Sequence, residues 1–254
     1  MQIHELVDIP KVPSAVRELE LSIYVDGKPH TLSDDDLAKL PELPELEYLL
    51  LSSAGKITKK GLKALAQSSP VVSRFGIRGG DDVGKGVAEL AGVWKDLETL
   101  EVGPATLTKA ELGKIAKLGL RRLEILSCRG VKAGALTAFE GNDTIEELLV
   151  RGIPFGKGDA QALATMPKLT TLRLHPGYTS KKFKRYDVKE GVFEAFGSAP
   201  VLERFDPGRP LSAGEAEALA NNSALKQLVV QCRDTEQVRG LAPLGNTSLE
   251  LIVT

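Results

Sequence analysis

Ten short segments of the chain share one pattern of apolar and polar positions, which reads apolar-x-x-apolar-x-apolar. The clearest copy runs from Leu97 to Val102. The copies begin, at intervals of 22 to 33 residues, at Val16, Leu46, Val72, Leu97, Leu123, Ile145, Leu169, Leu202, Leu225 and Leu249. One such segment in every 20 to 30 residues or so is typical of a solenoid, in which each copy supplies one layer of a continuous core.

A second pattern, with apolar residues three and four positions apart, lies between these segments. It occurs at 57–66, 107–116, 155–164 and 211–220, and it predicts helices because such residues share one helix face. In most copies a Thr or Ser follows the first apolar residue, where its hydroxyl oxygen suits an N-cap. The acidic triplet 34–36 occupies the same place, so we interpret it as acids favoured at a helix N-terminus. A cation site is the alternative.

A strand, a turn, a helix and a loop within one repeat require neighbouring strands to run parallel, with the helices on one side. The predicted fold is therefore α/β, a horseshoe-like solenoid with parallel strands on its concave face and helices on its convex face. Residues 1–15 do not match the repeat and are predicted to cap it, and residues 16–254 form about ten repeats. One buried column is expected to hold Leu49, Phe75, Leu100, Leu126, Leu148, Leu172 and Leu228.

The repeated segments resemble leucine-rich repeats, and the helix pattern Leu-Thr-x-x-Gly-x-x-Ala-Leu-Ala resembles the ribonuclease-inhibitor-like and GALA-type subclasses. The resemblance covers residues 16–254 and implies a protein-binding scaffold that uses its concave face. The family usually has Asn shortly after the strand, whereas this chain has none at 52–54, 78–80 or 103–105. The backbone groups of those turns must therefore bond to water or to each other. Pro207, at an inward position, makes the eighth strand irregular.

Composition bears on location more than on function. The formal net charge of −1 gives no bulk attraction to nucleic acid or to an anionic membrane. The first residues have neither a basic nor an apolar segment, and no run of about 18 apolar residues occurs, so neither a signal peptide nor a membrane span is expected. We predict a cytoplasmic protein, and the short Ala/Gly-rich repeat suggests a bacterial source. Cys128 and Cys232 lie four predicted strands apart, roughly 19 Å, which is too far for a disulfide.

One segment resembles a site for chemistry. Residues 79–86 fit the first seven positions of a phosphate-binding loop, and they lie between a predicted strand and a predicted helix. The eighth position is Gly86 instead of Ser or Thr, and two acidic residues within the segment would repel phosphate. We interpret it as a turn, with an enzyme or nucleotide-binding protein as the alternative. The histidines, His4, His30 and His175, are far apart in the repeat order, and none is spaced from other residues as in a zinc site or a catalytic triad. We therefore predict a non-enzymatic protein without cofactor or metal.

The repeat predicts which side chains face outward on the concave surface, because side chains alternate along a strand. Arginines gather on the middle copies, and apolar outward residues are candidate anchors for a partner. The alternative is a solvated face with scattered leucines and arginines. The predicted partner-binding residues are Tyr48, Leu50, Arg74, Arg78, Ile125, Arg129, Leu149, Arg151, Arg173, His175 and Arg204.

An insertion lengthens the seventh repeat at residues 177–187. Lys181, Lys182, Lys184 and Arg185 alternate there with aromatic residues, a combination that can bind phosphates and stack on bases. Three interpretations stay open: a solvated loop whose aromatic residues pack back on the solenoid, a protein contact, and a nucleic-acid contact.

The sequence thus predicts a protein–protein interaction module that binds a protein ligand on its concave face. The alternatives are an inhibitor or immunity protein that occludes another protein's active site, and a nucleic-acid binder acting through the insertion. We expect no small-molecule substrate and no membrane, and a monomer or weak dimer. The segment 249–254 would leave one strand edge unpaired, which a two-fold dimer, nearby loops or a longer chain would cover.

Overall fold

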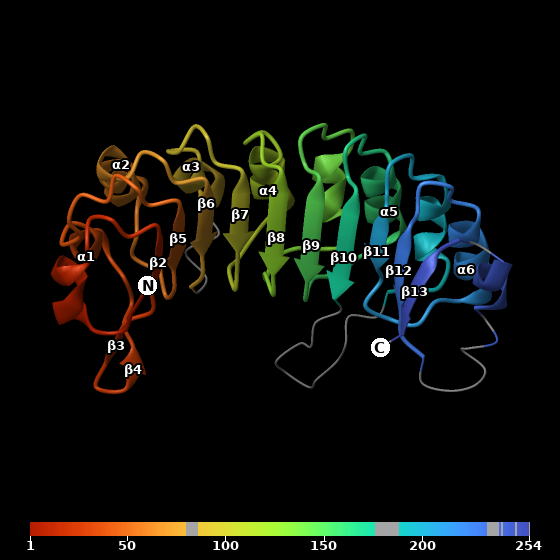
Figure 1. Ribbon diagram of the computed structural model, residues 1–254, viewed down its shortest axis with the longest axis horizontal. Coiled ribbons are helices and arrows are strands. Elements are labelled where there is room, and N and C mark those ends of the chain that lie inside the picture. Colours follow the sequence, from red (N-terminus) through yellow and green to blue (C-terminus); the bar gives the residue numbers. More distant parts are fainter. Residues whose placement is uncertain (80–85, 176–187, 233–238, 240, 247, 254) are drawn as a thin grey trace. The chain divides into compact units, whose positions relative to one another are not determined.

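The computed structural model describes residues 1–79, 86–175, 188–232, 239, 241–246 and 248–253. The chain divides into two compact units. Unit 1 comprises residues 1–120 and 128–130, and unit 2 comprises residues 121–127 and 131–254. Each unit contains a row of parallel strands joined by helical segments (Figure 1).

In unit 1 the strand order follows the chain, and every neighbouring pair is parallel. The strands are β1 (Gln2–Ile3), β2 (Glu18–Leu21), β5 (Tyr48–Leu51), β6 (Arg74–Ile77) and β7 (Thr99–Val102). The helical segments are η1 (Leu6–Lys11), α1 (Asp34–Leu37), α2 (Lys59–Ser68), α3 (Val87–Ala91) and α4 (Lys109–Ile115). A separate antiparallel hairpin joins β3 (Tyr24–Val25) to β4 (Lys28–Pro29).

In unit 2 the strands are also parallel and in chain order. They are β8 (Arg122–Leu126), β9 (Glu147–Arg151), β10 (Thr171–His175), β11 (Arg204–Asp206), β12 (Gln227–Val230) and β13 (Glu250–Val253). The helical segments are η2 (Ala135–Phe139), α5 (Lys157–Ala164), η3 (Val192–Ser198), α6 (Ala213–Ala220) and η4 (Ala242–Asn246).

Strands and helices form two layers within each unit. Figure 1 shows the strands side by side on one face, with the helices behind them. A parallel neighbour can be reached only by crossing over the sheet, and a right-handed crossover returns each time on the same side. The α/β arrangement of strands and helices predicted from the repeat is therefore confirmed in both units.

The core lies between these layers and follows the apolar positions of the repeat. In unit 1, Leu49, Phe75 and Leu100 are at the same register and are each at most 1% exposed. In unit 2, Leu172 and Leu228 are 0% exposed. Each such leucine contributes roughly 1.5 to 3 kcal/mol through burial of its side chain, so the repeated pattern is the main source of stability.

The predicted core is wrong at one layer. Leu123, not Leu126, is level with Leu148 and is fully buried, whereas Leu126 is half-buried. The fifth copy therefore begins at Leu120. The sequence fits the pattern at two starting points three residues apart, and the true one buries Leu120, Leu123 and Ile125 together.

The predicted helix starts are confirmed at atomic detail. The side-chain oxygens of Thr58, Thr108 and Ser212 each accept a hydrogen bond from a backbone amide in the first turn, at 3.2 to 3.3 Å. A free amide at a helix start needs such an acceptor. At α1, the backbone amide and hydroxyl of Ser33 donate to the carboxylate of Asp36 at 3.1 and 2.8 Å, so this acid serves the helix start.

Carboxylates also connect successive repeats. The Asp159 carboxylate, at the start of α5, accepts hydrogen bonds from the amides of Gly134 and Leu136 at the start of η2, at 2.7 and 2.8 Å. Glu215 at the start of α6 accepts in the same way from the amide of Phe193 in η3, at 3.1 Å. Each acid therefore satisfies the N-terminus of the preceding helical segment as well as its own, which is favourable because both ends carry partial positive charge.

The turns after the strands lack the expected asparagines and bond to each other instead. The amide of Ala54 donates to the carbonyl of Arg78 at 2.9 Å, and the amide of Gly79 donates to the carbonyl of Pro104 at 3.2 Å. In unit 2, the amide of Gly152 donates to the carbonyl of His175 at 2.9 Å. These turns thus satisfy one another's backbone groups, as the absence of asparagine required. Pro207 follows the end of β11, where its missing donor breaks no strand pairing.

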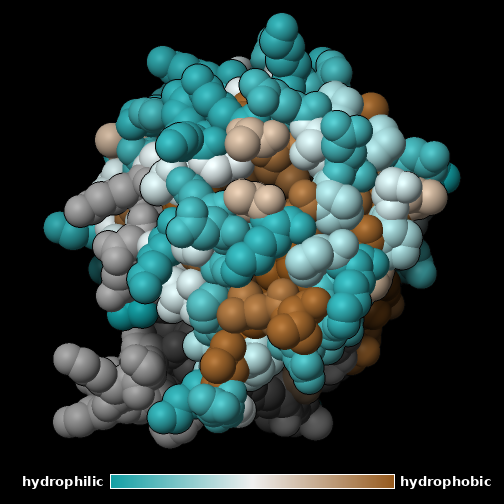
Figure 2. Space-filling view, turned by 90° about the vertical axis from the view of Figure 1, so that its left-hand side faces the viewer, coloured by the Kyte–Doolittle hydropathy of each residue, from teal (hydrophilic) through white to brown (hydrophobic). Residues whose placement is uncertain are grey.

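Residues 1–15 form β1 and η1 rather than a repeat. Ile3, Ile9 and Val12 are buried, at 4%, 0% and 4% exposed. Figure 2 views this end of unit 1, whose surface is mostly hydrophilic around a small apolar group. A polar outer face is what a solenoid end requires, so we retain the cap as a prediction.

The last strand is also one residue out of step with its prediction. Leu251 is level with Leu228, and Val253 with Val230, so the pattern of the tenth copy begins at Ser248 instead of Leu249. The register of β12 decides this point, because a shift by one residue would turn every side chain to the opposite face.

Candidate functional site

The outward face of β9 to β11 in unit 2 carries five of the eleven predicted site residues, namely Leu149, Arg151, Arg173, His175 and Arg204. Arg204 is level with Thr171 of β10, and Thr171 is level with Glu147 of β9. Two residues further along, Arg173 is level with Leu149, and two further still His175 is level with Arg151. Alternation along a strand therefore directs all these side chains to the same side of the sheet, away from the core column of Leu148 and Leu172.

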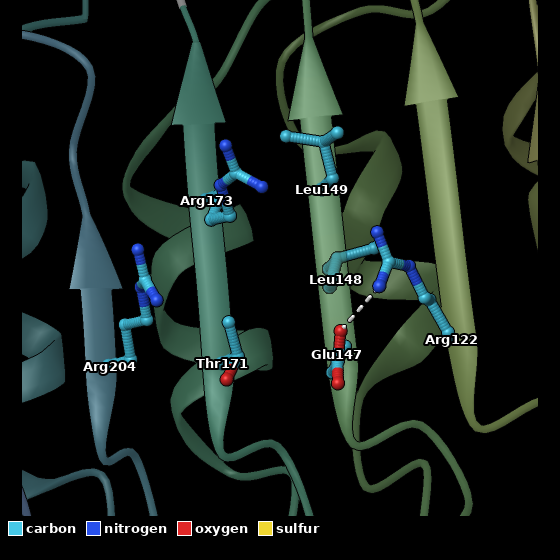
Figure 3. A pocket seen from close by; sticks show the side chains of 7 residues that line it. All are labelled: Arg122, Glu147, Leu148, Leu149, Thr171, Arg173 and Arg204. Atoms are coloured by element: carbon cyan, nitrogen blue, oxygen red, sulfur yellow. Dashed lines mark hydrogen bonds and ion pairs between the residues drawn. The ribbon is translucent and has the colours of Figure 1, made fainter.

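These side chains surround a shallow hollow of about 240 Å³ (Figure 3). Leu149 and Thr171 line it at opposite ends, and arginines from three strands stand around it: Arg122 from β8, Arg173 from β10 and Arg204 from β11. The hollow is therefore a cationic depression with an apolar and a hydroxyl group in its floor.

Three arginines lie on a diagonal across this face. Arg204, Arg173 and Arg151 belong to successive strands, and each is displaced by two residues from the one before. We call these three residues the arginine stripe. With strands about 4.8 Å apart and a rise of about 3.3 Å per residue, each step along the stripe is roughly 8 Å between Cα atoms.

The arginine stripe has no ionic partner among the residues that the structure describes, because no ion pair within 4.0 Å involves its members. Strand register explains this for the two outer arginines. Arg204 has Thr171 and Gln227 as its level neighbours, and Arg151 has His175 and Leu126. Arg173 is level with Asp206, but that carboxylate lies against His175 and accepts the amide of Gly208. The Nε atom of Arg173 is buried without a hydrogen-bond acceptor. Its guanidinium is thus partly desolvated with no described anion at ion-pair distance, a costly arrangement for a cation.

Arg122 differs from the stripe, although it borders the same hollow. Its guanidinium contacts Glu124 at 2.6 Å and Glu147 at 3.0 Å, and Figure 3 shows it directed toward Glu147. The sequence assigned neither Arg122 nor Glu124 to the outward face, because the fifth copy was started three residues late. The correct start was recognisable only from the strand register.

His175 ends the outward row of β10. Its Nε2 lies 3.6 Å from Oδ2 of Asp206, whose Oδ1 accepts a hydrogen bond from the amide of Gly208 at 3.0 Å. Burial lowers the pKa of His175, and the charges of Arg173 and Arg151 lower it further, while Asp206 opposes them. His175 is therefore neutral at pH 7.

The outward face of unit 1 has a different charge arrangement. Arg74 forms an ion pair with Glu18 and lies over the ring of Tyr48, with 5.0 Å between Cζ and the ring centroid. Arg78 forms an ion pair with Glu101 at 2.6 Å, and the pKa of this guanidinium is raised chiefly by that hydrogen bond. Arginines here are neutralised by acids of the same unit.

Two of the predicted site residues, Leu50 and Ile125, are wrong because they are buried, and Arg129 stays a prediction. Leu50 is only 3% exposed, because it lies over the bare backbone of Gly76, where an added Cβ would come within 2.5 Å of its Cδ1. Ile125 is 0% exposed and belongs to the core. Arg129 is exposed in unit 1, in a turn where its backbone forms an isolated bridge with Thr106.

Two other candidate sites from the sequence lie mostly outside the residues that the structure describes. Most of the segment that resembles a phosphate-binding loop, at residues 80–85, and the basic insertion at 177–187 lie outside the described residues. Within the described part, no cluster of three or more His, Cys, Asp or Glu side chains is arranged to hold a metal ion. No helix among these residues is long and apolar enough to cross a membrane.

No known family model matches the chain, and no curated protein matches it either. Solved structures do. The chain is similar to one from the yeast complex of Rad7 and Elc1, with a TM-score of 0.56 and 18% identity over 88% of this chain and 60% of that chain. For an internalin from Listeria monocytogenes, the TM-score is 0.49 and the identity is 14%, over 92% of this chain and 73% of that chain. For a leucine-rich-repeat protein from Leptospira interrogans, the TM-score is 0.36 and the identity is 11%, over 99% of this chain and 81% of that chain.

At such identities the similarity concerns the fold. The strand, turn and helix of each repeat, the parallel register and the buried leucine column within each unit identify a leucine-rich-repeat fold. The ribonuclease-inhibitor-like and GALA-type subclasses stay predictions.

Proposed function

We propose that this chain is a protein-binding scaffold that contacts its partner through the outward strand face of unit 2. The observation that carries the proposal is the arginine stripe, whose members form no ion pair within 4.0 Å among the described residues. Arginines in unit 1 do form such pairs. Arginines that form no ion pair within the fold, and of which one is partly desolvated, are suited to contact a partner at an interface.

The surroundings of the stripe support the same function. Leu149 is half-buried between Arg122 and Arg173, so it offers an apolar contact encircled by charge. Binding interfaces are typically built from a small apolar or aromatic centre with arginines around it. An inhibitor that occludes another protein's active site would use the same face, and the identity of the partner separates these two functions.

A site-specific photo-cross-linker tests the proposal in cells of the source organism. Placed at Thr171, which lines the hollow, it should yield a covalent adduct with one protein, which mass spectrometry identifies. The matched position is Gln161, which is exposed on α5 at the helix side of the same unit. Adducts with the same protein from Gln161 and none from Thr171 would assign binding to the helices and reject the proposal.

A further inference from the structure

The spacing of the arginine stripe restricts what can bind it. Its members recur about every 8 Å along a straight diagonal, since each step combines one strand spacing with two residues of rise. Alternate side chains of an extended peptide lie on one side and about 6.7 Å apart. The remaining difference is small enough for the flexible side chains of arginine and glutamate to absorb. Three arginines in this arrangement thus match three acidic residues at alternate positions.

The charges around the stripe favour carboxylates over phosphates. Glu147 lines the hollow, and Asp206 is level with Arg173 on the neighbouring strand. These two acids would repel a phosphate dianion more strongly than a carboxylate, because the phosphate carries twice the negative charge. A carboxylate also matches the planar guanidinium fork in two parallel hydrogen bonds. The hydroxyl of Thr171, which has no hydrogen-bond partner in the described part of the chain, is a further donor.

We propose that the arginine stripe binds an extended acidic segment of a protein partner, with carboxylates on alternate residues. This inference rests on the proposed function, because it names the chemistry of the partner at that face. The central carboxylate contacts Arg173, where it compensates the partly desolvated guanidinium. The outer two contact Arg151 and Arg204, which are exposed, so their contributions are smaller and more sensitive to salt.

Fluorescence anisotropy at low ionic strength tests the inference with two labelled peptides of equal charge. One peptide has three glutamates separated by single serines, and the other has the same three glutamates in succession. The full chain should bind the alternating peptide at least threefold more tightly. Arg173→Gln should weaken that binding about tenfold, and Arg151→Gln or Arg204→Gln about threefold each, as expected for partly buried and for exposed charge pairs.

The control variant is Arg121→Gln, which removes the same charge from the same unit. Arg121 is already held by Glu146 at 2.8 Å, so this change should alter affinity less than twofold. A melting temperature close to that of the unchanged protein shows that each variant is folded.

Equal affinity for the two peptides would overturn the inference, because it would indicate attraction to charge without spacing. So would stronger binding of a phosphoserine peptide or of a single-stranded RNA oligomer that is lost in the same variants. Any of these outcomes would reject the acidic segment as the ligand, but the proposed function would still hold if the cross-linker at Thr171 captures a protein. Absence of that adduct, with the peptide result intact, would reject the function and not the carboxylate site.

Discussion

Two arginines at equivalent positions of the repeat show how neighbouring residues decide the role of a side chain. Arg74 and Arg204 both occupy the first outward position of their strands. Arg74 pairs with Glu18, two strands away. The acids two strands away from Arg204 at the same level are Glu147 and Glu250, and they are held by Arg122 and Gln227 instead. One arginine is therefore neutralised within its own unit, and the other is available to an external anion.

At the same scale, leucines three residues apart make a matched pair for stability. Leu123→Ala should lower the free energy of unfolding by about 2 to 5 kcal/mol, because it opens a cavity at a fully buried position. Leu126→Ala should cost about 1 kcal/mol or less, since Leu126 is only half-buried. Urea denaturation of the two variants provides the comparison. A larger loss for Leu126→Ala would restore the start of the fifth copy at Leu123.

His175 makes binding at the stripe dependent on pH. Its pKa lies below the ordinary value of 6.5 because of burial and the nearby Arg173 and Arg151, so it gains a proton only as the pH falls below that value. The added charge should raise the affinity for the alternating acidic peptide as the pH falls below 6.5, until the peptide carboxylates themselves protonate near pH 4.3.

Anisotropy titrations across this pH range measure the effect, and His175→Gln should abolish the rise. An identical pH profile in that variant would assign the dependence to another group.

At the scale of elements, the acids at the helix starts connect neighbouring repeats. Glu215 is fully buried, receives Arg209 at 2.6 Å and accepts the amides of Ser212 and Phe193 at 3.0 and 3.1 Å. Burial raises the pKa of Glu215, but these hydrogen bonds outweigh it and the net pKa is lowered. One carboxylate thus stabilises two helical segments and the guanidinium of Arg209.

Glu215→Gln should therefore destabilise the fold by about 3 kcal/mol, because it leaves the largely buried guanidinium of Arg209 without its counter-charge. Since the native pKa is depressed, the stabilisation is present above the unfolded value of about 4.5 and is lost as the pH falls through the native pKa. Chemical denaturation at several pH values should show a smaller loss toward acid pH in Glu215→Gln. The exposed Glu217 on the same helix is the control, and an equal cost for Glu217→Gln would argue against the account.

The elements could be predicted from the sequence wherever local patterns decide them. Helix starts at Thr58 and Ser212 depend on residues two or three positions apart, so the prediction succeeded. The position of Leu123 could not be fixed, because the leucine-rich stretch fits the repeat twice and only pairing with β9 selects one fit. The burial of Leu50 depends on Gly76 in the next repeat, a long-range contact that no local pattern encodes.

At the scale of the whole molecule, the net charge of −1 conceals a local separation of charges. The strand face of unit 1 combines arginines with acids, while that of unit 2 has three arginines without such partners among the described residues. The outward arginines were predictable from the alternation along each strand. Their pairing was not, because an ion pair depends on the register between strands and on side-chain conformation.

The central claim is that the arginine stripe is the binding face, and an NMR titration tests it most directly. The Nε–Hε resonances of Arg151, Arg173 and Arg204 should shift on addition of the alternating acidic peptide, with Arg173 shifting most. Those of the acid-paired Arg74 and Arg121 should remain in place. Shifts confined to arginines outside the stripe, or spread evenly over all of them, would contradict the account.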